Sequence, residues 1–182
     1  MPNSIITGTG SYIPELKIEN SKFLNTEFYN SNHEKLTKLN KDIIATFQDI
    51  TCIRERRWVT DDLMTSDIAY FAAKDALNGG DGEDLDYIIV AHNFGDVRPG
   101  TARVDICPSI AARVKHLLGI KNPYTVAYDI PFGCPGWVHG MTIADFYIRS
   151  GQVKKVMVIG AETLSRVIDI HDIDSMIFAD GA

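Results

Sequence analysis

Three short strand-like segments, separated by helical ones, constrain the fold of this chain more than any other feature of its sequence. They are Leu85–Ala91, Tyr124–Asp129 and Val156–Gly160. The last is a continuous apolar run, which is typical of a strand buried on both faces of a sheet. Strands that alternate with helices at this spacing predict an α/β architecture with a mostly parallel sheet flanked by helices.

The remaining segments carry weaker signals of secondary structure. Apolar periodicity and end signals predict helices over three segments: Thr65–Asn78 with Thr65 as the N-cap, Pro108–Gly119, and Pro135–Ser150. Two more strands are expected at Ser4–Thr9 and Ser175–Ala179, and the stretch Asn20–Thr46 is compatible with helix. The irregular stretch Asn93–Asp105 is long enough to predict a functional loop.

Cys134 lies at the turn between the second strand and the helix that follows it. The order along the chain is strand, Gly133, Cys134, Pro135 and helix. Unpaired N–H groups and the positive end of the helix dipole stabilise a thiolate or an oxyanion at such a place. Gly133 and Gly136 are expected to leave room for a bulky thioester. From the residues alone, Cys134 is either a nucleophile or a small buried hydrophobic residue.

The other two cysteines, Cys52 and Cys107, have weaker cases as nucleophiles. Cys52 lies in a polar stretch without a glycine turn, and Cys107 precedes Pro108 near a helix start, where we expect it to pack. Three widely spaced cysteines indicate neither a disulfide framework nor a zinc site, so no metal or cofactor is expected. The expected environment is a reducing cytosol, and the expected location is cytoplasmic.

Charge and hydropathy argue against several other classes of protein. The net charge of −6 disfavours a nucleic-acid binder. No apolar run approaches the ~20 residues of a membrane helix, and the first residues lack the features of a signal peptide. The tight basic cluster of Arg54, Arg56 and Arg57 is either a solvated turn or a contact for a phosphate or an acidic carrier.

Several segments, in the right order, resemble the ketoacyl-ACP synthase III family (3-oxoacyl-[acyl-carrier-protein] synthase III) of the thiolase superfamily. They are Ile5–Glu15, Thr51–Trp58, Thr65–Leu77, Asp86–Ala91, His116–Asn122 and Tyr128–Arg166. The last is similar to the family's segment around its active cysteine, and Phe178–Ala182 looks like the start of its Gly-Asp-Gly-Ala segment. The likeness stops at Ala182, about midway through a full-length member. It implies that residues 1–182 form a thiolase-like N-terminal domain without the family's C-terminal half.

The resemblance implies a condensing enzyme of fatty acid biosynthesis. Family members take an acyl group from a thioester onto the cysteine, here Cys134, and condense it with malonyl-ACP to give a 3-oxoacyl-ACP. They also use a His and an Asn of their second half, which this chain does not contain. His139, five residues beyond Cys134, is expected to have a structural or surface role. The implied partners are acyl carrier protein and acyl thioesters (acyl-CoA or acyl-ACP), and a homodimer is the expected assembly.

Three positions bear on the acyl chain that such an enzyme would accept. The resemblance places Cys107, Leu164 and Phe178 at acyl-pocket positions. Family members often carry a Phe at the Cys107 position, and it reaches across the dimer to limit the neighbour's pocket. A smaller thiol there would admit a longer or branched chain, although ordinary sequence drift explains the change as well.

Other departures bear on the acyl donor. Where well-studied members contact the adenine end of coenzyme A with a Trp and two Arg, this chain has Thr46, Ile50 and Asp172 or Ile173. None of these side chains stacks or pairs as a Trp or Arg does. Our hypothesis is therefore a donor other than conventionally bound acetyl-CoA, such as a longer acyl chain or an acyl-ACP.

Two other interpretations stay open at this point. The chain is either a condensing-enzyme half or a non-catalytic, truncated partner subunit of a condensing enzyme. A redox-responsive thiol protein ranks last, because no resolving cysteine lies near Cys134 in the sequence. For a condensing-enzyme half and for a partner subunit alike, the absence of the family's second half is expected to expose apolar helix faces and to favour oligomers.

Overall fold

A parallel sheet of three strands forms the centre of the computed structural model, which describes residues 3–101 and 103–182. Its strands are β3 (Tyr87–His92), β6 (Val126–Pro131) and β7 (Val156–Gly160), in the order β6-β3-β7. In the register, Ile89 of β3 lies beside Tyr128 of β6 and Val158 of β7. The three predicted strands are confirmed to within two residues at each end. Their carboxyl ends lie at one edge of the sheet, where ligands of α/β proteins bind.

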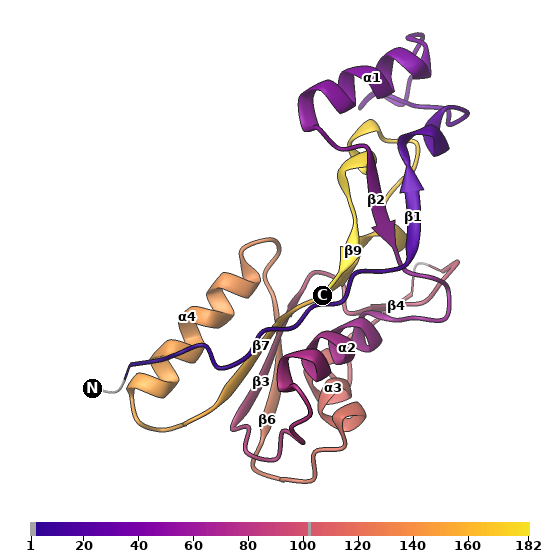
Figure 1. Cartoon of the computed structure of the whole chain (residues 1–182). Helices are drawn as coiled ribbons and strands as arrows, with labels where there is room; N and C mark the ends of the chain where they lie inside the picture. Colours follow the sequence, from indigo (N-terminus) through magenta and orange to yellow (C-terminus); the bar gives the residue numbers. More distant parts are fainter. Residues whose placement is uncertain (1–2, 102) are drawn as a thin grey trace.

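Helices cover both faces of this sheet (Figure 1). The helices α2 (Thr65–Leu77) and α3 (Ile110–Leu118) lie on one face, and α4 (Gly136–Arg149) lies on the other. All three were predicted, but Thr65 is the first helical residue and Met64 is the N-cap. The Met64 N–H donates to the Asp67 carboxylate at 2.8 Å, which explains why the helix begins one residue earlier than predicted.

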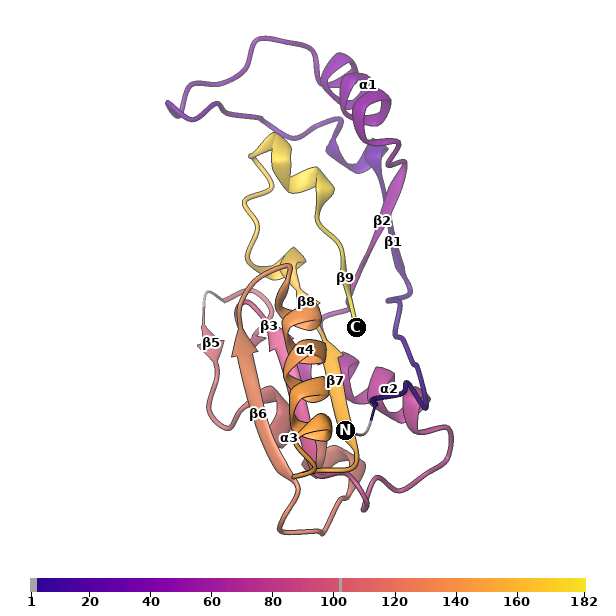
Figure 2. The same cartoon turned by 90° about the vertical axis from the view of Figure 1, so that its left-hand side faces the viewer.

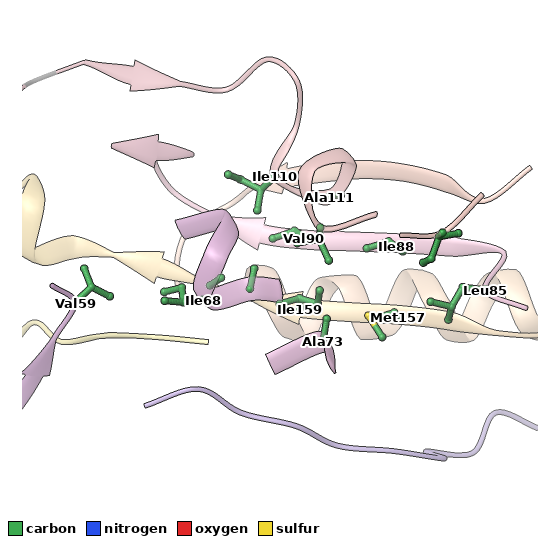
Figure 3. Packing of buried hydrophobic residues seen from close by; sticks show 14 residues of the cluster. Val59, Ile68, Ala73, Leu85, Ile88, Val90, Ile110, Ala111, Met157 and Ile159 are labelled. Atoms are coloured by element: carbon green, nitrogen blue, oxygen red, sulfur yellow. The ribbon is translucent and has the colours of Figure 1, made fainter. Parts of the chain in front are cut away.

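The main hydrophobic cluster fills the space between the sheet and the helices α2 and α3. Figure 3 shows Ile88 and Val90 of β3 among side chains from both helices. Five branched aliphatic side chains of the cluster have no exposed surface: Ile68, Ile88, Val90, Ile110 and Val114. Burial of each such side chain is worth about 1.5–3 kcal/mol, so this layer stabilises the edge of the sheet that carries the candidate site.

Two glycines let α4 lie close to the opposite face of the sheet. A Cβ at Gly136 would lie 3.0 Å from the Ala91 Cβ, and one at Gly140 would lie 2.8 Å from the Val158 Cγ1. Gly136 is therefore buried against β3, and our expectation that it leaves room for a thioester was wrong. Three apolar residues of α4, Trp137, Val138 and Phe146, are exposed, in agreement with the expected exposure of apolar helix residues.

A second, smaller cluster lies away from the sheet, in the upper part of Figures 1 and 2. It is built on β1 (Leu16–Glu19), which pairs antiparallel with β2 (Glu55–Trp58), together with α1 (Asn40–Thr51) and the 3₁₀ helices η1 (Asn20–Phe23) and η3 (Ile173–Ile177). The remaining 3₁₀ helix, η2 (Leu164–Arg166), contributes no residue to this cluster. Its buried side chains are Ile18, Phe23, Phe28, Ile43, Phe47 and Met176. Only the ends of the stretch Asn20–Thr46 are helical, because its apolar residues pack individually into this cluster rather than along one stripe.

Arg56 belongs to this second cluster and is almost fully buried. Its guanidinium donates to the Ile18 carbonyl and the Asn20 side chain, and it lies over the rings of Phe23 and Phe47. The interpretation of the basic cluster as a solvated turn is therefore wrong for Arg56, which is a structural residue. Arg54 and Arg57 retain exposed surface.

The two remaining predicted strands are wrong. No strand forms at Ser4–Thr9, whose glycine Gly8 lies against the Ala76 carbonyl of α2. A side chain at Gly8 would overlap that carbonyl, so the glycine allows the segment to pack on a helix instead of a strand. Ser175–Ala179 lies mostly in η3, and the last strand, β9 (Asp180–Gly181), pairs with β8 (Glu162–Thr163).

The predicted loop Asn93–Asp105 contains a short hairpin of β4 (Asp96–Val97) and β5 (Val104–Asp105). Ala102 of this loop lies outside the described residues, as do Met1 and Pro2 of the segment compared with a signal peptide. In the described ranges, no helix is long and apolar enough to cross a membrane.

Candidate active site

Cys134 lies on an exposed turn at the carboxyl edge of the sheet. Strand β6 ends at Pro131, and Gly133 turns the chain with a φ of +76°. The Gly136 N–H then donates to the Gly133 carbonyl at 2.9 Å, and α4 begins with Pro135 as its N-cap. The thiol therefore precedes the positive end of α4, where an anion is stabilised. The alternative of a small buried hydrophobic residue is excluded by the exposure of Cys134.

The other two cysteines lie elsewhere on the surface. Cys52 is the left-handed C-cap of α1, with a φ of +58°. Cys107 lies between β5 and α3 and is exposed, so the expectation that it packs in the interior was wrong. All three thiols are free. The described residues contain no group of His, Cys, Asp and Glu side chains that could hold a metal ion.

The other two predicted pocket residues lie in the segment that follows β7. Leu164 begins η2 and is half-buried, whereas Phe178 follows η3 and is more exposed. The Phe178 carbonyl accepts a hydrogen bond from the Trp58 Nε1 at 3.1 Å, which ties this segment to β2. Among the described residues, no hydrogen bond or ion pair joins Leu164 or Phe178 to Cys134, so their role in an acyl pocket stays a prediction.

A pocket of about 710 Å³ lies beside β7, between the N-terminal segment and α4. Apolar side chains such as Ile5, Trp137 and Met141 line it, together with residues of β7. None of Cys107, Cys134, Leu164 and Phe178 is among its described lining residues. This pocket is therefore distinct from the predicted acyl pocket.

The ends of the three parallel strands carry a buried polar network that sequence reasoning missed. Asp129 of β6 accepts the backbone N–H of Ile110 at 2.6 Å and that of Ala111 at 2.8 Å, which fixes the start of α3. Its Oδ2 also lies 2.9 Å from the Nε2 of His92, the last residue of β3. The other ring nitrogen of His92, Nδ1, accepts the Gly95 N–H at 3.0 Å. These contacts assign the neutral tautomer with the proton on Nε2.

Glu162, two residues after the end of β7, binds the loop that follows β3. Its carboxylate accepts the Asn93 N–H at 2.6 Å. The side-chain oxygen of Asn93 lies 3.5 Å from the position that a Cβ on Gly133 would occupy. Asn93 therefore flanks the residue before Cys134. A polar residue at or within two residues of the end of an apolar strand was the signal in the sequence that could have identified His92 and Glu162.

His139 lies at the surface, as predicted. Its ring stacks on that of Phe132 with 4.9 Å between the ring centroids, and both side chains are exposed. Phe132 precedes Gly133 in the turn. The stacking therefore steadies the outer side of the turn and leaves the Cys134 thiol open to solvent.

Substitution of Glu162 by glutamine is expected to stabilise the protein increasingly as the pH rises. Burial raises the pKa of the Glu162 carboxyl above its ordinary value of 4.5, against hydrogen bonds from Asn93 that lower it. The folded state then binds more protons than the unfolded state just above pH 4.5. The contribution of Glu162 to the free energy of unfolding therefore falls as the pH rises through the folded-state pKa.

Urea unfolding of the wild type and Glu162→Gln from about pH 4 to about pH 8 measures this difference. The difference should grow with pH and then level off. Glu27→Gln is the control, because the hydrogen bond from Lys35 lowers the pKa of Glu27 and reverses the sign. A difference between wild type and Glu162→Gln that does not change with pH would contradict the expectation.

Comparison with known proteins shows what this arrangement is similar to. The family model for 3-oxoacyl-[acyl-carrier-protein] synthase III matches residues 128–182, which include Cys134. The beta-ketoacyl-[acyl-carrier-protein] synthase III of Ehrlichia canis is 38% identical over 185 residues, covering 100% of this chain and 51% of the relative. That of Xanthomonas campestris is 35% identical, covering 98% of this chain and 49% of the relative.

Solved structures agree with the fold. The synthase III of Thermus thermophilus superposes with a TM-score of 0.74 at 31% identity and covers 98% of this chain. That of Aquifex aeolicus superposes with a TM-score of 0.73, also at 31% identity. The chain spans about half the length of these proteins, 49% and 51% respectively.

Proposed function

We propose that the chain, which is similar to members of the 3-oxoacyl-[acyl-carrier-protein] synthase III family, carries the acyl-accepting half of a condensing enzyme. Its thiolase-like α/β fold spans about half the length of the relatives. The observation that carries the proposal is the exposed Cys134 on a glycine turn directly before α4. A substrate can reach this thiol without any rearrangement of the chain.

The proposed reaction is a thioester exchange at Cys134. The Cys134 Sγ, as a thiolate, attacks the carbonyl carbon of an acyl thioester and forms a tetrahedral oxyanion. The carbon–sulfur bond to the donor then breaks, and the donor leaves as a thiolate that takes up a proton from solvent. We infer that the Cys134 N–H and the start of α4 stabilise the oxyanion.

The second step, decarboxylative condensation with malonyl-ACP to give a 3-oxoacyl-ACP, is proposed to need more than this chain. The resemblance places the His and Asn of that step in the other half of the family's length. We therefore propose that the chain alone accepts an acyl group but does not condense it. A cytoplasmic homodimer, working with acyl carrier protein, remains part of the proposal.

The donor is proposed to be an acyl-ACP or a long acyl chain rather than acetyl-CoA. Ile50, at one of the three coenzyme A contact positions, is exposed on α1. Thr46 on the same helix bonds to the Asp42 carbonyl at 2.7 Å, and the carboxylate of Asp172 caps η3. An aliphatic chain, a hydroxyl and a carboxylate offer no stacking surface or positive charge to an adenine nucleotide. Cys107, Leu164 and Phe178 are the proposed contacts of the acyl chain.

Intact-mass spectrometry of the folded chain after incubation with matched acyl-CoA and acyl-ACP donors tests this function. We expect the mass gain of one acyl group, located on Cys134 by peptide mapping, and faster labelling by the acyl-ACP. The same chain length on both donors is the control for acyl preference. Equal or faster labelling by acyl-CoA would refute the donor preference, and no labelling by either donor would refute acyl transfer by this chain.

A non-catalytic partner subunit is the second candidate. The exposed apolar side chains Trp137, Val138 and Phe146 of α4 favour it, because a partner would remove them from water. A folded chain that takes no acyl group, yet increases the labelling of a full-length synthase, would support this second function.

A further inference from the structure

His92 is a buried titratable group to which the proposed reaction assigns no role. Only 5% of its surface is exposed, and both of its ring nitrogens have partners. A buried histidine with two satisfied nitrogens is held in one orientation, and so are the groups bonded to it. In this case, those groups are the strand that leads to Cys134 and the loop beside it.

We propose that His92 is a positioning residue for Cys134. It holds the loop Asn93–Gly95 against the turn that presents the thiol. This role rests on the proposed function of Cys134 as the acyl acceptor. His92 does not touch the thiol or the substrate, and it acts through the backbone of Gly95 and the side chain of Asn93.

The first link runs from the ring to the loop. The Gly95 N–H donates to the His92 Nδ1 at 3.0 Å, closing a tight turn over three residues. Gly95 adopts a φ of +72°, in the left-handed region that favours glycine. From the other side, the Glu162 carboxylate holds the Asn93 N–H at 2.6 Å. The loop is therefore fixed at both ends, and Asn93 has a defined position.

The second link runs from the loop to the thiol. The side-chain oxygen of Asn93 lies beside Gly133, the residue before Cys134. If the Gly95 bond is lost, the loop is held only by Glu162, and Asn93 is free to move away from the turn. Misplacement of catalytic groups by about 1 Å, and loss of supporting contacts, typically costs 10-fold to 100-fold in rate.

Only a neutral imidazole supplies both of the bonds that are observed. Asp129 accepts two backbone N–H groups of α3, and its contact with His92 requires that the histidine nitrogen is a donor. Gly95 requires an acceptor. Histidine with its proton on Nε2 provides the donor at one nitrogen and the acceptor at the other. Two amide substitutions can therefore separate the two bonds.

The test compares His92→Asn with His92→Gln, and peptide mapping follows Cys134 separately from Cys52 and Cys107. Asparagine places an acceptor oxygen where Nδ1 was and loses the donor to Asp129, whereas glutamine reaches Asp129 and loses the acceptor for Gly95. We expect acylation and iodoacetamide alkylation of Cys134 to slow by less than about 3-fold in His92→Asn, and by at least about 10-fold in His92→Gln. The free energy of unfolding of each variant is measured in parallel.

A merely structural histidine would slow both variants in proportion to their lost stability, and that result would overturn the proposal. Alkylation keeps the test separate from the proposed function. If the wild type is alkylated at Cys134 but never acylated, the acyl-transfer function fails while the contrast between the two variants is still measured.

A measurement on the wild type completes the test without relying on the folding of any variant. The long-range ¹H–¹⁵N spectrum of the His92 ring at neutral pH is expected to show an unprotonated Nδ1. A proton on Nδ1 would overturn the proposal, because that nitrogen could not then accept the Gly95 N–H.

Discussion

Replacement of Cys134 by serine is expected to abolish acyl labelling of this chain, a loss of at least about 1,000-fold in rate. A serine hydroxyl at neutral pH is almost entirely protonated, and it is a poor nucleophile unless a general base lies within hydrogen-bond reach. The buried histidine of the network, His92, already donates to Asp129 and accepts from Gly95. It is therefore occupied and not available to activate a serine.

Cys52→Ser is the matched control, and Cys107→Ser tests the remaining exposed thiol. Neither thiol lies directly before an α-helix of the length of α4, so labelling should persist in both variants. Intact mass and peptide mapping, with donor disappearance followed by chromatography, give the rates. If labelling survives in Cys134→Ser and disappears in Cys107→Ser, the nucleophile is Cys107 at the start of α3 and not Cys134.

The central sheet could be predicted from the sequence because its strands are short apolar runs, and few other secondary structures would bury such runs. Val156–Gly160 was predicted with the observed boundaries, since a β-branched run between a helix and a turn has few other ways to be buried. The turn that carries Cys134 was predicted for a similar reason. This turn is defined locally by Gly133 and by the start of α4.

The segments that were mispredicted depend on contacts that are distant in the sequence. Ser4–Thr9 has the composition of a strand, but Gly8 packs on the Ala76 carbonyl of α2. Likewise, the sequence indicates that Arg56 is a surface cation, yet its guanidinium lies over two aromatic rings of the second cluster. Neither environment can be inferred from neighbouring residues, because tertiary packing overrides local propensity.

The polar network at the strand ends was missed for a different reason. His92 and Asp129 are 37 residues apart, and only the parallel pairing of β3 with β6 brings them together. A single histidine at the end of a strand is compatible with many roles. The sequence could therefore predict which edge of the sheet carries the site, but not which side chains support it.

Replacement of Asp129 by alanine is expected to lower the free energy of unfolding by about 3–5 kcal/mol. The Asp129 side chain is 10% exposed and accepts three hydrogen bonds, from Ile110, Ala111 and His92. Alanine leaves all three donors without an acceptor, and each buried donor that loses its partner costs about 1–3 kcal/mol unless water replaces it. The start of α3 also loses the carboxylate that caps its first turn, which is worth about 0.5–2 kcal/mol and overlaps with that sum.

Asparagine should not rescue the protein fully, because three donors face the two carboxylate oxygens and an amide offers only one oxygen. Its NH₂ group would meet an N–H donor instead of an acceptor. Urea unfolding of Asp129→Ala and Asp129→Asn measures both effects, with Asp49→Ala on the exposed side of α1 as a control expected within about 0.5 kcal/mol of the wild type. A loss below about 1 kcal/mol in Asp129→Ala would mean that water satisfies the donors, and that the network does not hold α3 against the sheet edge.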